Sequence, residues 1–380
     1  MTSRLGLTAA AVVLVALVPG ATPANGAKPA AVGKDGLAKL RLLRPGPGNP
    51  RNSEGDFVQL KDGSLLFVYT HFTGGGGDHS AAHLAGRLSR DSGRTWTGKD
   101  TIVVPNEGKR NVMSVSLLRL RSGQIALFYL RKNSTEDCRP YMRVSTDEAK
   151  TWSAPRLCID PVGYNVLNND RVVQLDSGRL VLPVSRHGGP GQKWSAAGEI
   201  SCWLSDDRGK TWRQSRTVLN KRTERRRVVL QEPGVVALTD GRLMMFMRTT
   251  MGSQYLSYSS DRGGTWTPAK PSAIRSPCSP ASIERIPTTG DLLLVWNDHS
   301  KIAPALRGKR TPFTVAISSD EGKTWRNVRT IEDDPGGWYC YTAVQFVSGR
   351  VLLGHCAGQR KTGGLNVTQI TSFPVAWLYR

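Results

Sequence analysis

The chain is poor in cysteine and in acidic residues, and it contains only one long apolar run. None of its six cysteines belongs to a Cys-x-x-Cys pair or to a Cys/His cluster with metal-ligand spacing. We therefore expect no metal site and no cofactor. Acidic residues number 30 against 52 lysines and arginines, which gives a net charge of +22. This charge attracts anionic partners. Without a nucleic-acid-binding module or a basic stripe with interleaved aromatics, we expect no nucleic-acid partner.

The apolar run, Leu5–Val18, is too short to span a bilayer. It follows Arg4 and precedes the small residues of Ala21–Ala27, an order typical of a secretion signal. Residues 1–27 are therefore predicted to be a signal peptide for the general secretory (Sec) route, and the protein is predicted to be secreted. No cysteine lies near the expected cleavage region and no later apolar segment is long enough to cross a membrane. We therefore expect no lipid or membrane anchor.

A box of the form Ser-x-Asp-x-Gly-x-Thr-Trp occurs five times, and only the second copy departs from it, with Ala149 in place of the glycine. The copies begin at Ser89, Ser145, Ser205, Ser259 and Ser318. Their aspartates lie 56, 60, 54 and 59 residues apart, and such a period indicates one supersecondary unit used repeatedly. The aspartate can accept backbone N–H groups of a turn, the glycine tolerates positive φ and the tryptophan anchors the turn. We therefore interpret these aspartates as structural.

A second repeat, a turn glycine followed by an apolar strand, occurs six times. Its copies begin at Gly63, Gly123, Gly178, Gly241, Gly290 and Gly349. Apolar runs of this length between turn residues fit strands buried on both faces. Each unit is then a four-stranded sheet, and six such sheets arranged radially make a β-propeller. The predicted fold is all-β, a six-bladed propeller over residues 28–380 with five box turns.

The last predicted unit has no box after it. The N-terminal strand Leu37–Leu43 is expected to complete its sheet and close the ring, which removes exposed strand edges. The six sheets are expected to begin near Phe57, Val115, Val172, Val235, Ser282 and Ala343. In an exported protein disulfides are permitted. Cys138 and Cys158 flank the second box and could be bridged, although six cysteines allow 15 full pairings.

Residues just before the first strands and just after the second strands of a propeller meet on the face opposite the boxes. Before the first strands stand Glu54, Asp56, Asn111, Ser114, Asn169–Arg171, Glu232, Ser279 and Tyr341. After the second strands stand His71, Arg131, Arg186, His187, Arg248, Asn297 and Asp298. Acids, arginines and a tyrosine at one mouth are poorly explained by packing. They predict a binding or catalytic site.

Four segments of the chain resemble the sialidases. The segment Gln231–Arg248, with Glu232 before a proline and Arg248 at the end of a strand, is similar to the fourth-blade signature of that family. Arg310–Asp320 resembles the segment that supplies a carboxylate-binding arginine before a strand and its box. Tyr341-Thr-Ala-Val is similar to the last-blade motif Tyr-Ser-x-Leu, and Gly77-Asp78-His79 matches the first-blade loop with its acid/base aspartate. The resemblance covers the whole propeller.

The resemblance implies a retaining exo-glycosidase that releases sialic acid or a related acidic nonulosonic sugar. A carboxylate nucleophile would meet the like charge on the anomeric carbon of such a sugar, whereas Tyr341 is neutral until Glu232 takes its proton. Asp78 would protonate the leaving oxygen and later deprotonate water. Arg248 and Arg310 would hold the carboxylate of the substrate.

One part of the family's pattern is missing. Sialidases have a third arginine on the first strand of the first blade, where this chain has Ser53–Asp56, and Arg51 stands three residues early. Glu54 would then pair with an arginine or bind hydroxyls, and Arg171 or Arg186 could substitute for the missing group. The expected substrate-binding residues are therefore Arg248, Arg310, Glu54, Asp56, Asp170, Arg171 and Arg186.

Two alternatives stay open. The protein could hydrolyse a different acidic cell-surface glycan, which the missing arginine would permit, or it could be a non-catalytic carbohydrate-binding propeller. A lectin needs no trio of Asp78, Glu232 and Tyr341, and this favours the enzyme. The expected partner is a sialylated or other acidic glycan, and the protein is expected to be a monomer.

Overall fold

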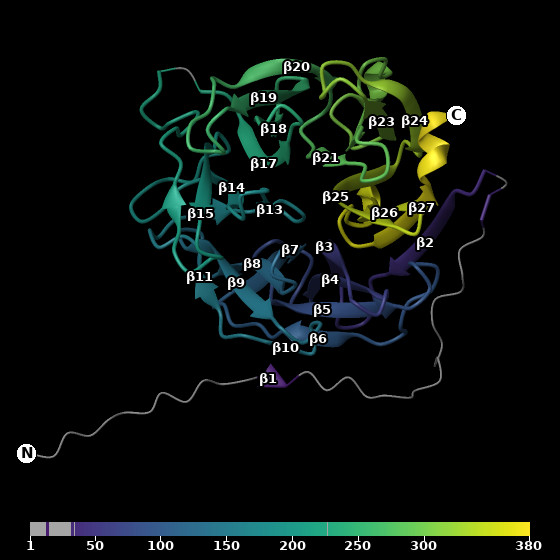
Figure 1. Cartoon of the computed structure of the whole chain (residues 1–380), viewed down its shortest axis with the longest axis horizontal. Coiled ribbons are helices and arrows are strands. Elements are labelled where there is room, and N and C mark those ends of the chain that lie inside the picture. Colours follow the sequence, from purple (N-terminus) through teal and green to yellow (C-terminus); the bar gives the residue numbers. More distant parts are fainter. Residues whose placement is uncertain (1–12, 15–31, 34, 226) are drawn as a thin grey trace, which may run out of the picture.

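The computed structural model describes residues 13–14, 32–33, 35–225 and 227–380. The predicted signal peptide, residues 1–27, lies outside these ranges except for the two-residue strand β1 (Val13–Leu14), which pairs with β10 (Thr151–Trp152). Figure 1 shows six sheets around a common centre, with β3, β7, β13, β17, β21 and β25 innermost. The predicted all-β six-bladed propeller is confirmed. In the described part of the chain, no helix has the length and apolar character needed to cross a membrane.

The blades follow one another in chain order. Blade 1 contains β3 (Arg51–Gln59), β4 (Leu65–Phe72), β5 (Ala82–Ser89) and β6 (Thr101–Val104). Blade 2 contains β7 (Asn111–Arg119), β8 (Ile125–Lys132), β9 (Cys138–Ser145) and β11 (Arg156–Leu157). Blade 3 contains β12 (Asn165–Val166), β13 (Val173–Gln174), β14 (Leu180–Arg186), β15 (Glu199–Ser205) and β16 (Arg213–Gln214).

The second half of the ring repeats this order. Blade 4 contains β17 (Leu230–Ala237), β18 (Leu243–Thr249), β19 (Ser253–Ser259) and β20 (Lys270–Arg275). Blade 5 contains β21 (Ser282–Arg285), β22 (Leu292–Trp296), β23 (Phe313–Ser318) and β24 (Arg326–Glu332). Blade 6 contains β25 (Gly337–Val347), β26 (Arg350–Gln359), β27 (Thr368–Pro374) and β2 (Ala38–Leu43). Three short 3-10 turns complete the structure, at Pro304–Leu306, Arg360–Thr362 and Val375–Tyr379.

The ring closes through the N-terminal strand, as predicted. β2 pairs antiparallel with β27 and becomes the outer strand of blade 6. Blade 3 differs from the other blades because its first strand is split into β12 and β13, which both pair with β14. Residues 167–172 run between these two short strands and carry Asn168-Asn169-Asp170-Arg171 along the centre of the ring.

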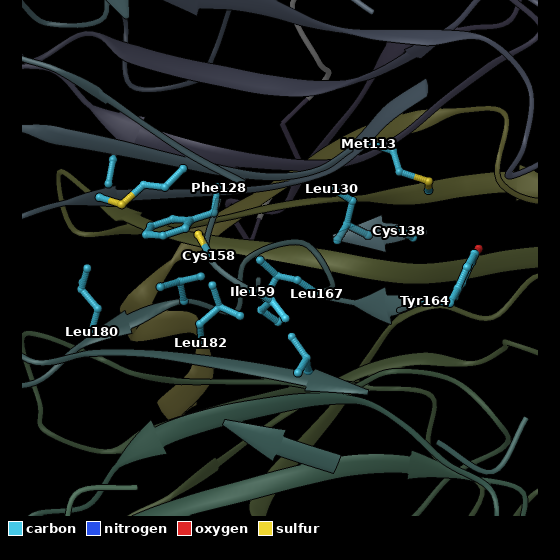
Figure 2. Close-up of a cluster of buried hydrophobic side chains, with 14 of the residues drawn as sticks. Met113, Phe128, Leu130, Cys138, Cys158, Ile159, Tyr164, Leu167, Leu180 and Leu182 are labelled. Carbon is cyan, nitrogen blue, oxygen red and sulfur yellow. The ribbon is translucent and has the colours of Figure 1, made fainter. Parts of the chain in front are cut away.

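The apolar cores lie between neighbouring blades. The cluster in Figure 2 joins blade 2, through Phe128 and Leu130, to blade 3, through Leu180 and Leu182. The box tryptophans fill these boundaries: Trp96, for example, packs with Phe57 of its own blade and with Leu352 of blade 6. Each box therefore fixes a blade to the one before it as well as closing its own turn. Burial of aromatic surface at these positions stabilises the whole ring.

The five boxes use the hydrogen bonds that their sequence predicts. In each one, the aspartate Oδ1 accepts from the serine hydroxyl and from the threonine N–H, and Oδ2 accepts from the threonine hydroxyl. Ala149 adopts φ 63° at the position where the other boxes have glycine. The aspartate oxygens are occupied within the turn, in agreement with a structural role.

The inner strands of four blades contain a β-bulge at the same place. The strand register shifts between Ser53 and Asp56, between Met113 and Ser116, between Gln231 and Gly234, and between Cys340 and Ala343. The bulged residues have positive φ: 56° at Glu54, 58° at Ser114, 49° at Glu232 and 56° at Tyr341. Non-glycine residues rarely adopt this conformation, and a bulge turns its side chain out of the normal alternation of the strand.

Replacing Asp207 by alanine tests the role of the boxes. The change leaves the Ser205 hydroxyl and the Thr211 N–H and hydroxyl without their acceptor, and we expect a loss of about 1–3 kcal/mol in the free energy of unfolding in urea. Asp206→Ala is the matched control, because its 51% exposed carboxylate pairs with Arg179 and Arg213 at the surface and should contribute about 1 kcal/mol or less. Equal losses for the two variants would contradict the structural role of Asp207.

Candidate active site

Glu232, Arg248 and Tyr341 meet in one hydrogen-bonded group. The Tyr341 hydroxyl donates to Glu232 Oε1 at 3.2 Å, and Arg248 Nη1 lies 2.8 Å from Glu232 Oε2 and 3.4 Å from the Tyr341 hydroxyl. Arg248 Nε also donates to Gln231 Oε1 at 2.8 Å, which fixes the plane of the guanidinium. The bulges of β17 and β25 bring the acid and the tyrosine together across 109 residues of sequence.

Arg310 covers the other side of Tyr341. Its guanidinium carbon lies 5.2 Å from the centre of the Tyr341 ring and 5.0 Å from that of Trp338. The residue is 8% exposed, and its Nη2 donates to the Cys278 carbonyl at 3.4 Å. Among the described residues, no carboxylate lies within ion-pair distance of Arg310. Because buried charges are normally paired, this guanidinium is suited to receive an anionic group from a ligand.

Arg51 joins Asp78 to Glu54. Its Nη1 lies 2.6 Å from Asp78 Oδ1, its Nη2 lies 2.9 Å from Glu54 Oε1, and the Phe72 ring packs 4.4 Å from the guanidinium carbon. Ser114 donates to the second Glu54 oxygen at 2.7 Å. The sequence comparison placed Arg51 three residues too early to take part. In the structure the bulge between Ser53 and Asp56 turns Glu54 toward Arg51. The arginine side chain is long enough to contact Glu54 with one nitrogen and Asp78 with the other.

The two groups are connected through Asn169. Its Nδ2 donates to the carbonyl of Gly55, beside Glu54, at 2.9 Å and to the carbonyl of Tyr341 at 3.1 Å. One amide from the split strand of blade 3 therefore ties the bulge of blade 1 to the bulge of blade 6. Through Asn169 the two groups form one network. Blade 1 contributes Asp78, Glu54 and Arg51, and blades 4, 5 and 6 contribute Glu232, Arg248, Arg310 and Tyr341.

Two residues of blade 2 hold the backbone of Asp78. Lys132 Nζ donates to the Asp78 carbonyl at 2.7 Å, and Asn111 Nδ2 donates to the same oxygen at 3.0 Å. The sequence reasoning named Arg131 at the end of this strand and missed Lys132. Alternation along β8 directs the two side chains to opposite faces, and Arg131 pairs with Glu107 instead. A lysine directly after Arg131 at the end of an apolar strand is the signal that could have been used.

Four of the predicted substrate-binding residues lie elsewhere. Asp56 accepts from the Phe57 and Leu117 N–H groups, and Asp170 accepts from the Val344 N–H at 2.9 Å. Arg171 donates to the Ala281 carbonyl at 2.7 Å. These three central residues brace neighbouring blades, and Asp56 and Asp170 line a cavity of about 640 Å³ toward the far end of β3. Arg186 pairs with Glu199 on the next strand at 3.3 Å.

The charges of the site shift its pKa values. Partial desolvation alone would raise the pKa of Asp78, whose side chain is 58% exposed, but Arg51 and then Lys132 hold it below its usual range. Burial raises the pKa of Glu54 although Arg51 opposes this effect. Burial, followed by the charge of Glu232, raises the pKa of Tyr341, so its hydroxyl is neutral in the free protein.

The arrangement has the parts needed for proton transfer and for attack by a hydroxyl group. Glu232 is placed to accept the proton of the Tyr341 hydroxyl, and Arg248 and Arg310 supply fixed positive charge beside the oxygen that would attack. Within the described residues, no group of three or more His, Cys, Asp or Glu is placed to hold a metal ion.

Comparison with known proteins gives consistent matches. Residues 74–353 match the family described as the BNR repeat-like domain. A curated sialidase of Bacteroides fragilis (strain YCH46) is 28% identical over 216 residues, which cover 53% of this chain and 36% of that protein, so this chain spans little more than a third of that relative's length.

Solved structures share the fold. The NanB sialidase of Streptococcus pneumoniae superposes with a TM-score of 0.70 at 14% identity, over 88% of this chain and 70% of that one. The sialidase of Trypanosoma rangeli in complex with sialic acid has a TM-score of 0.68 at 15% identity, over 90% and 60%. At these identities the structural likeness concerns the fold. Together with the family match, it confirms the resemblance that the sequence motifs indicate.

Arg51→Gln tests the electrostatic coupling in this site. Removing the cation should raise the pKa of Asp78 toward the ordinary aspartate value, because the largest opposing charge is lost while the desolvation and the charge of Lys132 remain. A ¹³C carboxyl NMR titration of aspartate-labelled protein, with Asp78→Asn to assign the signal, measures this change. Arg179→Gln, which removes a surface partner of Asp206, should leave the Asp78 signal unmoved. An unchanged Asp78 titration in Arg51→Gln would contradict the coupling.

Proposed function

Because the chain belongs to the family of BNR repeat-like domains and thereby to the sialidase superfamily, we propose that it is a retaining exo-glycosidase that releases a terminal sialic acid or a related acidic nonulosonic sugar. One observation carries the proposal. The Tyr341 hydroxyl donates to Glu232 while two guanidinium groups lie against it, and one of them, the buried Arg310, has no carboxylate partner among the described residues.

The first step uses Tyr341 as the nucleophile. Arg310 and Arg248 hold the substrate carboxylate and place the anomeric carbon above the tyrosine oxygen. Glu232 takes the phenolic proton as the oxygen attacks, so the bond to the sugar forms without a carboxylate approaching a carboxylate. The neutral state of Tyr341 in the free protein suits this step, because a phenolate would repel the substrate before it bound.

Asp78 supplies the proton for the leaving oxygen and later takes a proton from water. In the free protein, Arg51 keeps the Asp78 carboxyl ionised. An anionic substrate competes with Asp78 for Arg51, and loss of that contact raises the pKa of Asp78 toward the value that a general acid needs. Arg51 thereby takes the place that the sequence comparison left empty in the first blade.

The location proposed for the reaction is outside the cell. The secretion signal predicted over residues 1–27 supports it, and the net charge of +22 favours an acidic glycan over a neutral one. We propose that the partner is an acidic glycan and that the enzyme is a monomer. Its propeller extends over residues 28–380.

Tyr341→Phe tests the nucleophile. The variant keeps the ring beside Arg310 but loses the hydroxyl, so turnover of an aryl sialoside should fall by a factor on the order of 10³ or more, while the circular dichroism spectrum stays unchanged. Tyr339→Phe is the matched control on the same strand, since Tyr339 is buried against Phe313 and should retain turnover. Normal rates in Tyr341→Phe would remove this residue as the nucleophile.

A second candidate differs in the sugar. Glu54 stands beside Arg51, so one arginine of the site is shared between two protein carboxylates before any substrate arrives. This observation favours an acidic sugar other than the common sialic acid, with a hydroxyl bound by Glu54.

A panel of aryl glycosides separates these possibilities. Sialic, deaminated sialic and other ulosonic acid glycosides carry the carboxylate on the anomeric carbon and should be cleaved, whereas uronic acid glycosides carry it elsewhere and should not. Asp78→Ala is the inactive control. Cleavage of the uronides alone would overturn the sialidase-type reaction, and binding of the panel without any turnover would identify a carbohydrate-binding propeller.

A further inference from the structure

Two buried cysteines face each other directly behind the nucleophile. Cys340 on β25 and Cys356 on β26 are register partners in the antiparallel sheet of blade 6. They are 2% and 1% exposed. Cys340 is the residue before Tyr341, and it forms the last regular pair before the bulge that turns Tyr341 into the site. Nothing in the reaction described above uses either thiol.

The pair meets the geometric requirement of a disulfide. Residues opposite each other in antiparallel strands have Cα atoms about 4.5–5.5 Å apart, and disulfides span Cα separations of about 4.4–6.8 Å. The other cysteines are placed differently. Cys158 lies opposite Pro140 rather than Cys138, and Figure 2 shows the side chains of Cys138 and Cys158 apart from each other in the core cluster. The bridge considered from the sequence therefore has no matching register, whereas Cys340 and Cys356 do.

The two thiols are unequal. Burial opposes the thiolate of Cys340, but Cys356 and Arg310 outweigh it and lower the pKa of Cys340. The contact with Cys340, and then burial, raises the pKa of Cys356 well above its usual value. In the folded sheet, Cys340 is therefore the more acidic of the two thiols.

We propose that Cys340 and Cys356 form a cross-strand disulfide during folding, by exchange with a low-molecular-weight or protein disulfide. The thiolate of one of these cysteines attacks that donor, forms a mixed disulfide and releases one thiol. The other cysteine then attacks the sulfur of its partner and releases the second. The protein loses two protons and two electrons, and the donor disulfide takes them up and is reduced to two thiols. Because both residues are buried in the finished sheet, the exchange takes place before blade 6 has closed.

The bond has two consequences. It joins the strands beside the bulge and so fixes the backbone that presents Tyr341. It also removes the Cys340 thiol as a hydrogen-bond partner of Arg310, which leaves this guanidinium free for an anion. The second consequence rests on the proposed function, and the first does not.

Thiol counting on the full chain tests the bond directly. After refolding with oxidised and reduced glutathione, denatured protein should react with four equivalents of a thiol reagent instead of the six cysteines present, and a peptide map should join Cys340 to Cys356. Six reactive thiols, or a bond from Cys340 to Cys278, would overturn the proposal. Neither result depends on any glycosidase activity.

Stability gives an independent measurement. The oxidised form should melt about 5 °C above the form refolded with a reductant, and Cys356→Ser should abolish this difference. Cys278→Ser is the matched control: its oxidised form should have three reactive thiols and keep the full difference in melting temperature. If Cys356→Ser does not fold, the peptide map of the unmodified chain still decides. Equal melting temperatures together with an unlinked map would exclude the bond.

Discussion

The site depends on one constraint, the β-bulge in the inner strands, whose bulged residue adopts the left-handed backbone conformation. A regular strand alternates its side chains between two faces, and in a propeller blade these faces pack against the neighbouring blades. The bulge breaks this alternation at one residue. Glu54, Ser114, Glu232 and Tyr341 occupy it in four blades with φ near 50–60°, and all four contribute polar atoms to one network. Backbone strain of this kind is concentrated at functional sites, and here it recurs around the ring.

Charge is distributed unevenly through this network. Arg248 is paired with Glu232, and Arg51 with two carboxylates, while Arg310 has aromatic rings and a carbonyl around it. Desolvated cations are costly unless an anion accompanies them. An anionic ligand at Arg310 would complete the balance, and the same argument explains why its neighbour Cys340 is the more acidic of the two thiols in blade 6. Any anion bound at Arg310 and the state of that thiol would thus be linked through one guanidinium.

The residues along the centre of the ring have a structural role, although their sequence suggested that they bind substrate. Asn169, Asp170 and Arg171 reach the backbone of blades 1, 5 and 6 from the split strand of blade 3. Such bonds satisfy carbonyl and N–H groups that the bulges and strand ends leave without partners. Asn169 positions the backbones of Gly55 and Tyr341 relative to each other, so blade 3 supports the candidate site although none of the predicted catalytic residues lies on it.

The sequence alone determined the repeat, and with it the fold. The box period, the apolar strands and the surplus N-terminal strand each follow from local turn chemistry and alternation, which act over a few residues. The motifs also identified Glu232, Arg248, Arg310, Tyr341 and Asp78, which the structure brings into one network. Only the tertiary structure decided the roles of Arg51, Lys132 and Asn169. Bulges shift the strand register, and alternation selects which of two adjacent side chains faces inward. A linear alignment counts residues and contains neither effect, so it placed Arg51 too early and chose Arg131 over Lys132.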